Sequence, residues 1–390
     1  MFTNLYVHFP FCRNKCSYCA LYSRVGSSAA ARSEYVAAVA KEIAKLADMA
    51  GGSGGTGATG DAGTVYFGGG SPALCDLSPL APALASLLSK SPATSYQLTT
   101  NNYRLTTNNY EFTVELHPLD VTPAKLDELE SVGVNRISMG VQSLDDDVLR
   151  AMGRGYTADE AERAFSLVKS RFDNAGIDLI IGYPGDSVKW IDRLAGWGMK
   201  HCSAYSLQNE RGLKDVPGDD KVLDEIRTVA AFLKSIGLER YEISNYAVPG
   251  FECRHNLAVW RGEDYVGLGE GACGRVGFTR TRGVKAGGAA VAFDTSVSSV
   301  TPEFDLKERT MFRLRTREGL DASRFPEWIP TLERFVEEGL LTETAAWGHA
   351  PLLGHPLRGQ PAAGGYALPD VYYLTERGTE VCDFILAELV

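Results

Sequence analysis

The sequence predicts an α/β protein built on a parallel sheet, which would form either a barrel or a doubly wound sheet. Short apolar runs alternate with amphipathic stretches along most of the chain. Such alternation is typical of repeated β-α units, whose strands lie parallel to one another. The alternation stops near residue 300, and helical periodicity dominates after it. We therefore expect a core domain over residues 1–290 and a small, mostly helical C-terminal domain over residues 300–390.

The expected strands are apolar runs rich in β-branched and aromatic residues, bounded by turn-forming residues. Leu5-Tyr6-Val7-His8-Phe9 ends at Pro10, and the run 64–67 leads straight into the Gly-Gly-Gly-Ser-Pro segment of residues 68–72. The remaining core strands are expected at 112–115, 136–141, 177–181, 201–207 and 241–243.

Helices are expected where apolar residues recur at helical spacing on one face. In the core domain these segments are 29–49, 77–88, 123–132, 158–170, 187–194 and 221–236. In the C-terminal domain they are 306–314, 332–338 and 375–388, with short strands around Leu341 and Tyr372.

Two segments of the core domain do not fit the β-α pattern. Residues 51–63 are rich in glycine and contain no core-forming residue, which predicts a flexible linker. Residues 97–110 repeat the motif Leu-Thr-Thr-Asn-Asn-Tyr twice. Two copies are too few for a solenoid, so we interpret this segment as a local insertion or a small hairpin with turns at Asn-Asn.

Composition excludes several classes of protein. The chain has 390 residues, 44% of them hydrophobic, which is enough for a sizeable core. Its net charge of -10 would repel phosphates, so we expect no nucleic-acid partner. No apolar run is long enough to span a membrane, and the first residues do not resemble a signal peptide. Eight cysteines are too few for a disulfide scaffold, so we expect a reducing, cytoplasmic environment.

The cysteines Cys12, Cys16 and Cys19 form a C-x3-C-x2-C pattern on one short segment. Three thiolates on one loop can each bind one iron of a [4Fe-4S] cluster, and the fourth iron is then open to a small molecule. A zinc site would usually need a second Cys pair, which the chain lacks. A thioredoxin-like use of the last two cysteines would leave Cys12 unexplained.

This segment resembles the cluster motif of the radical S-adenosyl-L-methionine (SAM) superfamily, including the aromatic residue Tyr18 before the last cysteine. The run of residues 5–12 is similar to one branch, which contains oxygen-independent coproporphyrinogen III oxidase and the heme chaperone HemW. The resemblance implies a partial parallel (β/α)6-type barrel over residues 1–290. It also implies that SAM binds the open iron through its amino and carboxylate groups.

The resemblance implies a set of SAM-binding residues at the carboxyl ends of the strands. Gly69, Gly70 and Ser71 follow the second strand, and their backbone amides are expected to bond the amino-acid end of SAM. Glu115, Gln142, Arg154 and Asp178 match ligand-facing positions at or just after the next strands, although His117-Pro118 replaces the usual Asn-Pro or Asp-Pro. Tyr6, Tyr18, Ala204 and Ser206 are carried over from the same family pattern.

Within the branch, several segments are closer to HemW than to the oxidase. The oxidase usually has a longer N-terminal extension and another cysteine where this chain has Leu21. The segments 241–256, 260–269 and 313–320 look like HemW. That resemblance implies a protein that binds heme and delivers it to acceptor proteins. The alternatives are oxidative decarboxylation of coproporphyrinogen III by a 5'-deoxyadenosyl radical, or a radical reaction on another substrate.

The heme-binding residues are less defined by the sequence. His255 is the best candidate heme ligand, and the other interpretation is that it orders its own loop. Cys273 stands where the branch usually has His, and Val259 stands where it usually has Tyr. We expect packing roles for Cys75, Cys202 and Cys382, because each is isolated in the sequence.

Overall fold

The computed structural model describes residues 4–52, 63–89, 110–285, 293–343 and 371–389. Its contacts divide the chain into two compact units. The first contains residues 1–239, 245–255 and 264–299, and the second contains residues 240–244, 256–263 and 300–390. The second unit thus includes two short segments from the region that we assigned to the core domain. Most of the linker and of the tandem repeat lie outside the described residues.

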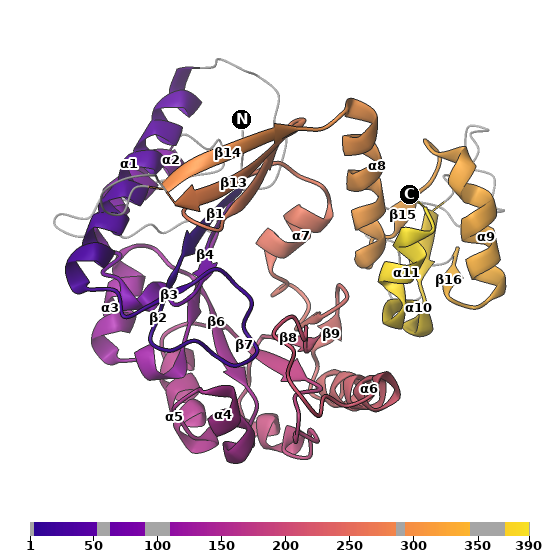
Figure 1. Cartoon of the computed structure of the whole chain (residues 1–390), viewed down its shortest axis with the longest axis horizontal. Helices are drawn as coiled ribbons and strands as arrows, with labels where there is room; N and C mark the ends of the chain where they lie inside the picture. The colour runs from indigo at the N-terminus through magenta and orange to yellow at the C-terminus, as the bar shows by residue number, and fades with distance from the viewer. Residues whose placement is uncertain (1–3, 53–62, 90–109, 286–292, 344–370, 390) are drawn as a thin grey trace. The chain divides into compact units, whose positions relative to one another are not determined.

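The first unit is built on a large sheet with a parallel centre (Figure 1). Six strands follow one another in chain order and pair in parallel: β1 (Asn4–Phe9), β4 (Thr64–Gly69), β5 (Glu111–Leu116), β6 (Arg136–Gln142), β7 (Asn174–Ile181) and β8 (His201–Ser206). A seventh parallel strand, β11 (Tyr265–Leu268), pairs with the free edge of β1. The predicted α/β fold is therefore confirmed.

Further strands, most of them antiparallel to their neighbours, extend both sides of this parallel centre. Beyond β8 lie β10 (Asn245–Ala247) and β9 (Glu239–Arg240), and beyond β11 lie β12 (Cys273–Val276), β13 (Thr279–Lys285) and β14 (Phe293–Ser299). No pairing among the described strands joins β14 to β9, so the sheet is open there. Strands β13 and β14 were not predicted, because they are largely exposed and polar and lack the apolar pattern that identifies a strand.

Helices α1 (Ala29–Gly52), α2 (Ala81–Ser89), α3 (Pro123–Ser131) and α5 (Ala158–Lys169) lie along one side of the parallel strands (Figure 1). Two more helices of the first unit are α4 (Asp146–Met152) and α6 (Asp219–Ser235). Alternate residues of β1 enter the core between the sheet and α1, where Phe9 and Phe11 pack against Tyr35. The other face of β1 carries Tyr6 and His8.

The helix predicted over residues 187–194 is wrong. A 3-10 helix at Ile191–Gly196 follows a turn instead. Asp186 is 1% exposed, and its Oδ1 accepts hydrogen bonds from the amides of Ser187 and Val188 and from the indole of Trp190. Because these two amides are used in the turn, and because Val188 has a φ of 45°, an α-helix cannot begin there.

The second unit has a separate hydrophobic core. Its main helices are α8 (Pro302–Phe312), α9 (Ile329–Glu337), α10 (Glu376–Glu380) and α11 (Cys382–Ala387). A small sheet of β15 (Leu320–Asp321), β17 (Val371–Leu374) and β16 (Leu341–Thr342) completes it. The strands expected around Leu341 and Tyr372 are therefore present. The single helix expected over 375–388 is divided at Val381, which has a non-helical φ of -124°.

One helix, α7 (Arg254–Trp260), begins in the first unit and continues in the second. The strand expected at 241–243 is instead a single bridge between Glu242 and Thr316 inside the second unit.

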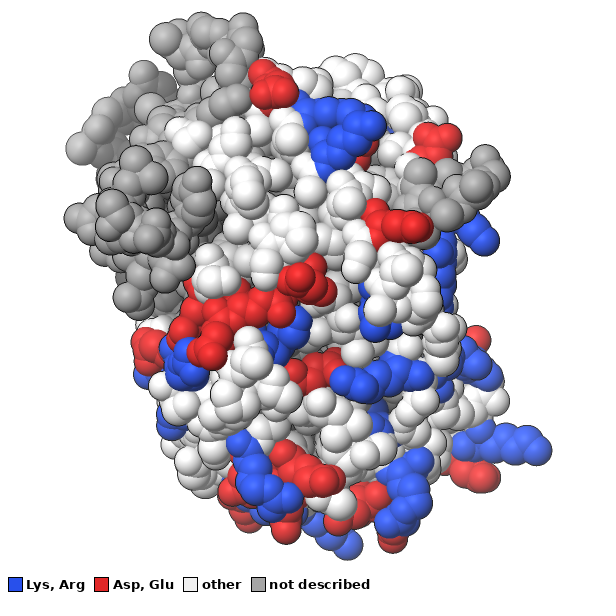
Figure 2. Space-filling view, turned by 90° about the vertical axis from the view of Figure 1, so that its left-hand side faces the viewer, with Lys and Arg blue, Asp and Glu red and all other residues white. Residues whose placement is uncertain are grey.

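In the part of the chain that is described, no helix combines the length and apolarity needed to cross a membrane. Acidic and basic side chains are interspersed on the face that Figure 2 shows.

Candidate functional site

A cavity of about 280 Å³ lies at the carboxyl ends of the parallel strands in the first unit. Residues from the segment after β1 and from β4, β5, β6, β7 and β8 contribute to its wall, which is the position where α/β sheets usually bind ligands. The predicted site residues that line it are Cys12, Cys16, Tyr18, Cys19, Gly69, Gly70, Ser71, Glu115, Gln142, Arg154 and Asp178.

The three cysteines lie on a segment that we call the cysteine loop (residues 12–25). Its two ends are paired as short strands, β2 (Phe11–Cys12) and β3 (Arg24–Val25). The three thiols are free and half-buried, and burial raises the pKa of the Cys12 thiol. Among the described residues, no three Cys, His, Asp or Glu side chains form a site for a single metal ion. A cubane cluster does not need such a site, because each thiolate binds a different iron.

Arg154 connects the cysteine loop to the end of β6. Its guanidinium Nη1 lies 3.6 Å from Cys16 Sγ and 3.3 Å from the Tyr18 hydroxyl, and Nη2 donates to the Gly140 carbonyl at 2.5 Å. Burial alone would lower the pKa of Arg154, but the neighbouring Tyr156, Tyr18 and Cys16 raise it overall. The guanidinium is therefore a permanent buried positive charge beside a predicted cluster ligand.

Glu115 and Asp178 bring two carboxylates to the cavity wall. Glu115 Oε1 accepts from the Tyr66 hydroxyl at 2.9 Å, and Oε2 accepts from the Gly69 amide at 3.0 Å. Asp178 Oδ1 accepts from the Ser138 hydroxyl at 2.9 Å. Burial, followed by repulsion from Asp178, raises the pKa of Glu115 to about 7, and burial also raises the pKa of Asp178. A cationic ligand would stabilise both carboxylates in their charged form.

Gln142 reaches the cavity because of an irregularity in β6. The pairing of β6 with β7 shifts between Gly140 and Gln142, and Gln142 has a φ of 72°. This left-handed backbone is costly for a residue with a side chain, and such strain is often found at functional sites. The bulge turns the Gln142 amide towards the cavity, where its Oε1 accepts from Tyr205 at 3.3 Å.

The glycine segment after β4 lines the cavity, but its amides are not available as we expected. Gly69 donates to Glu115, Gly70 to the Phe9 carbonyl at 2.8 Å, and Ser71 to the Phe11 carbonyl at 2.7 Å. The glycines instead allow close packing, since a Cβ on Gly70 would lie 2.5 Å from the Phe11 carbonyl oxygen. The Ser71 hydroxyl donates to Asp120. The expected contact between these amides and SAM is therefore not supported.

Four predicted residues lie outside the cavity lining. Alternation along β8 explains two of them, because Ser203 and Tyr205 line the cavity, so Ala204 and Ser206 point to the opposite face. Tyr6 lies on β1, and its hydroxyl is 3.1 Å from His8 Nδ1. The fourth residue, His255, lies at the other edge of the sheet.

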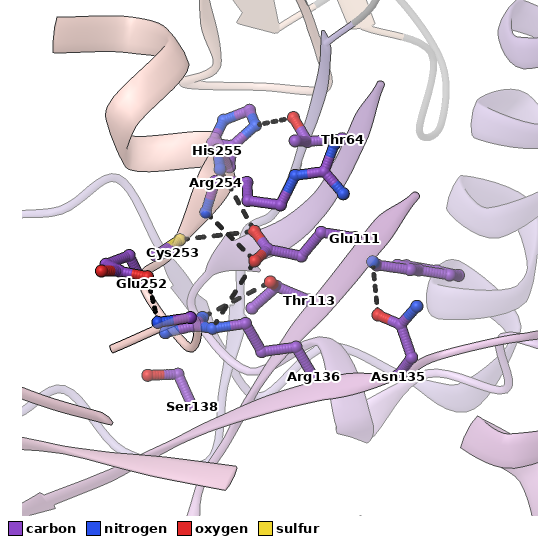
Figure 3. Close-up of polar contacts among 12 residues, drawn as sticks. Thr64, Glu111, Thr113, Asn135, Arg136, Ser138, Glu252, Cys253, Arg254 and His255 are labelled. Carbon is purple, nitrogen blue, oxygen red and sulfur yellow. Dashed lines mark hydrogen bonds and ion pairs between the residues drawn. The ribbon is translucent and has the colours of Figure 1, made fainter. Parts of the chain in front are cut away.

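His255 belongs to a buried polar cluster at the amino ends of the strands (Figure 3). Its Nδ1 lies 2.7 Å from the hydroxyl of Thr64, the first residue of β4, and its amide donates to Glu111, the first residue of β5. Burial lowers the pKa of His255 to about 4. Its contacts attach the start of α7 to the first residues of β4 and β5.

The other cysteines lie in different environments. Cys75, Cys202 and Cys382 are buried, which agrees with packing roles. Cys253 is buried, and its thiol lies 3.6 Å from Glu111 Oε1. Cys273 is exposed on β12 and is the partner of Arg282 on β13.

Several residues of the cavity wall were not predicted from the sequence. Asp120 is 5% exposed and accepts hydrogen bonds from both Arg13 and Ser71. The hydroxyl of Tyr66 donates to Glu115, and that of Tyr205 donates to Gln142. Strand alternation could have identified the two tyrosines, because each lies on a predicted strand two residues from another inward-facing position. No local pattern distinguishes Asp120 from a surface aspartate.

The chain is similar to known proteins along most of its length. Residues 6–197 match the model of the radical SAM superfamily. The chain is 29% identical over 391 residues to the heme chaperone HemW of Bacillus subtilis, covering 91% of this chain and 97% of the relative. It is 32% identical over 305 residues to HemW of Synechocystis, covering 72% of this chain and 69% of the relative.

A solved structure, coproporphyrinogen III oxidase (HemN) from Escherichia coli, has the same fold. The TM-score is 0.70 at 19% sequence identity, and the match covers 99% of this chain and 89% of that chain. The match to the superfamily model defines a radical SAM protein, and its cofactors are a [4Fe-4S] cluster and SAM. Within that superfamily, the chain belongs to the HemW family.

Proposed function

We propose that Cys12, Cys16 and Cys19 hold the [4Fe-4S] cluster and that SAM binds in the cavity beside them. The observation that carries this proposal is that all three thiols line the same cavity as Arg154, Glu115 and Asp178. Three thiols suit three irons of a cubane and leave the fourth iron for another ligand. The positive charge of Arg154 beside Cys16 would stabilise a thiolate there.

The polar groups of the cavity are complementary to a zwitterionic ligand with an additional positive charge. Glu115 and Asp178 would accept bonds from the amino or ribose groups of SAM and attract its sulfonium, and Gln142 can both donate and accept. Arg154 would attract the ligand's carboxylate. When bound, the cluster and SAM supply one-electron chemistry, while these side chains hold and orient the ligand.

We further propose that the protein binds heme and delivers it to acceptor proteins in the cytoplasm. Support comes from the heme chaperones to which it is similar along most of its length. The second candidate is oxygen-independent oxidation of coproporphyrinogen III, which the shared fold with HemN keeps open. The carrier is favoured because Leu21, which stands where the oxidase usually has a cysteine, lines the cavity without a thiol.

Anaerobic reconstitution with iron and sulfide tests the cluster ligands. Replacing Cys12, Cys16 or Cys19 by Ala should abolish the bound iron and the brown absorbance of the cluster. Cys75→Ala is the matched control, because this buried thiol lies outside the cavity lining and should leave the iron content unchanged. Full iron content in the Cys12, Cys16 and Cys19 variants would show that the ligand assignment is wrong.

Two parallel assays on the same reconstituted sample separate the carrier from the oxidase. One adds heme and follows its Soret band, then adds an apo-acceptor protein and measures transfer. The other adds coproporphyrinogen III, SAM and a reductant, and measures release of carbon dioxide. Heme binding and transfer without carbon dioxide release is the expected result. Repeated release of carbon dioxide would contradict the carrier and support the oxidase.

A further inference from the structure

Glu270 is a buried carboxylate that the proposed function does not use. It is 1% exposed and lies in the turn after β11, at the edge of the sheet from which the cysteine loop emerges. Its Oε2 accepts from the Tyr22 hydroxyl at 2.7 Å, and its Oε1 forms an ion pair with Arg24. Both partners belong to the last residues of the cysteine loop, 22–25, which we call its returning arm. One carboxylate therefore bonds this arm at two points.

The turn that carries Glu270 is itself held firmly. The Glu270 amide donates to the hydroxyl of Tyr35 at 3.1 Å, and the same hydroxyl donates to the His8 carbonyl at 2.7 Å. Strand β13 bonds the turn on its other side through Gly283, whose carbonyl accepts from the Gly271 amide at 2.9 Å. The carboxylate is therefore fixed relative to β1, the strand that leads into the cysteine loop.

Glycines on both sides of Glu270 allow the turn to lie close to Tyr35 on one side and to Tyr22 on the other. Gly269 has a φ of 98°, and a Cβ there would lie 2.2 Å from the Tyr35 hydroxyl oxygen. Gly271 has a φ of 86°, and a Cβ there would lie 2.9 Å from the Cβ of Tyr22. Larger residues at either position would push the turn away from β1 or from the cysteine loop.

The ion pair with Arg24 also connects Glu270 to a cysteine, through the pairing of two short strands. Arg24 and Val25 form β3, which pairs with β2 so that Phe11 lies opposite Arg24 and Cys12 lies opposite Val25. The Arg24 amide also donates to the Pro10 carbonyl at 2.5 Å. In addition, His8 Nε2 lies 2.8 Å from the Tyr22 carbonyl oxygen. Holding β3 in place therefore holds the backbone of Cys12.

We propose that Glu270 is a positioning residue of the cluster site: it clamps Tyr22 and Arg24, keeps β3 paired with β2, and thereby presets Cys12 before the cluster binds. This inference rests on the proposed function for the role of Cys12, whereas the clamp itself rests on the contacts alone. Glu270 does not line the cavity, so its effect on the cluster is indirect.

The first test uses the full chain without its cluster and measures hydrogen–deuterium exchange. Glu270→Ala should speed exchange of the amides of residues 22–25 by at least about tenfold, because the arm would open locally. Exchange in α3 should not change. Glu34→Ala, which replaces an exposed glutamate on α1, is the control and should leave the cysteine loop unchanged. Unaltered exchange of residues 22–25 in a folded Glu270→Ala protein would overturn the clamp.

Glu270→Gln covers the case in which the alanine variant does not fold. The amide oxygen can still accept from Tyr22, but the variant has no charge to pair with Arg24. Exchange of residues 24–25 should rise by a smaller factor than in the alanine variant. A folded glutamine variant with unaltered exchange there would also overturn the clamp.

The second test measures how fast a chelator removes iron from the reconstituted protein. A several-fold faster loss in Glu270→Gln supports the positioning of Cys12. Faster amide exchange with an unchanged rate of iron loss would overturn that positioning while leaving the clamp. If Cys12→Ala itself retains full iron content, the ligand assignment fails, and the exchange experiment still decides the clamp separately.

Discussion

Replacing Glu115 by Gln should change how the stability of the apoprotein depends on pH. Burial and Asp178 raise the pKa of Glu115 from 4.5 to about 7 in the folded chain. Between these values the folded state binds more protons than the unfolded state, so stability falls as pH rises. The free energy of unfolding should therefore fall by about 2 to 3 kcal/mol between pH 5 and pH 8, because a tenfold change in proton affinity corresponds to about 1.4 kcal/mol.

Glu115→Gln removes this titration while keeping the shape of the side chain. Its amide oxygen can accept from the Gly69 amide, and its NH2 group can donate to the Tyr66 hydroxyl, which then acts as the acceptor. The free energy of unfolding of the glutamine variant, relative to the wild type, should therefore rise by about 2 to 3 kcal/mol as pH rises from 5 to 8. Loss of the negative charge should also weaken SAM binding in the reconstituted protein.

The assay is urea unfolding of anaerobic apoprotein at several pH values between 5 and 8. Glu303→Gln serves as the control, because it makes the same chemical change on a side chain that is 78% exposed. The informative quantity is the difference in unfolding free energy between each variant and the wild type. Parallel curves for wild type and Glu115→Gln, or a difference that grows towards low pH, would refute the proposed protonation of Glu115.

Three further variants test other parts of the structure. Glu111→Ala should cost about 3 to 5 kcal/mol of unfolding free energy, because it removes the carboxylate beside buried Arg136 and the acceptor for His255, while Glu111→Gln should cost less. Gln142→Gly should raise the stability of the apoprotein by about 0.5 to 1 kcal/mol by relieving its positive φ, yet weaken SAM binding measured by calorimetry. Phe335→Ala should cost the second unit about 3 to 5 kcal/mol and lower its melting transition, because the ring is fully buried against neighbours such as Phe384. Equal stability in the first or third variant, or unchanged SAM affinity in the second, would contradict these assignments.

The parallel centre of the sheet and the cysteine motif could be predicted from local patterns. Strands β1, β5 and β7 are buried along most of their length, so each appears in the sequence as a short apolar run. Side chains in the carboxyl halves of parallel strands lie towards one edge of the sheet, which is why Glu115, Gln142 and Asp178 line one cavity. The exposed strands β13 and β14 escaped detection because their residues are largely solvated.

The sequence by itself determined the class of this protein, since the spacing of Cys12, Cys16 and Cys19 and the β-α order are local properties of the chain. Only the tertiary structure decided which groups remain available to a ligand. The amides of Gly70 and Ser71 are used by β1 and the segment after it, and His255 lies at the opposite edge of the sheet from the cavity. The contacts of Asp120 and Glu270 with the cysteine loop join residues far apart in the chain. Such pairings depend on which strands become neighbours, and no local sequence pattern records that.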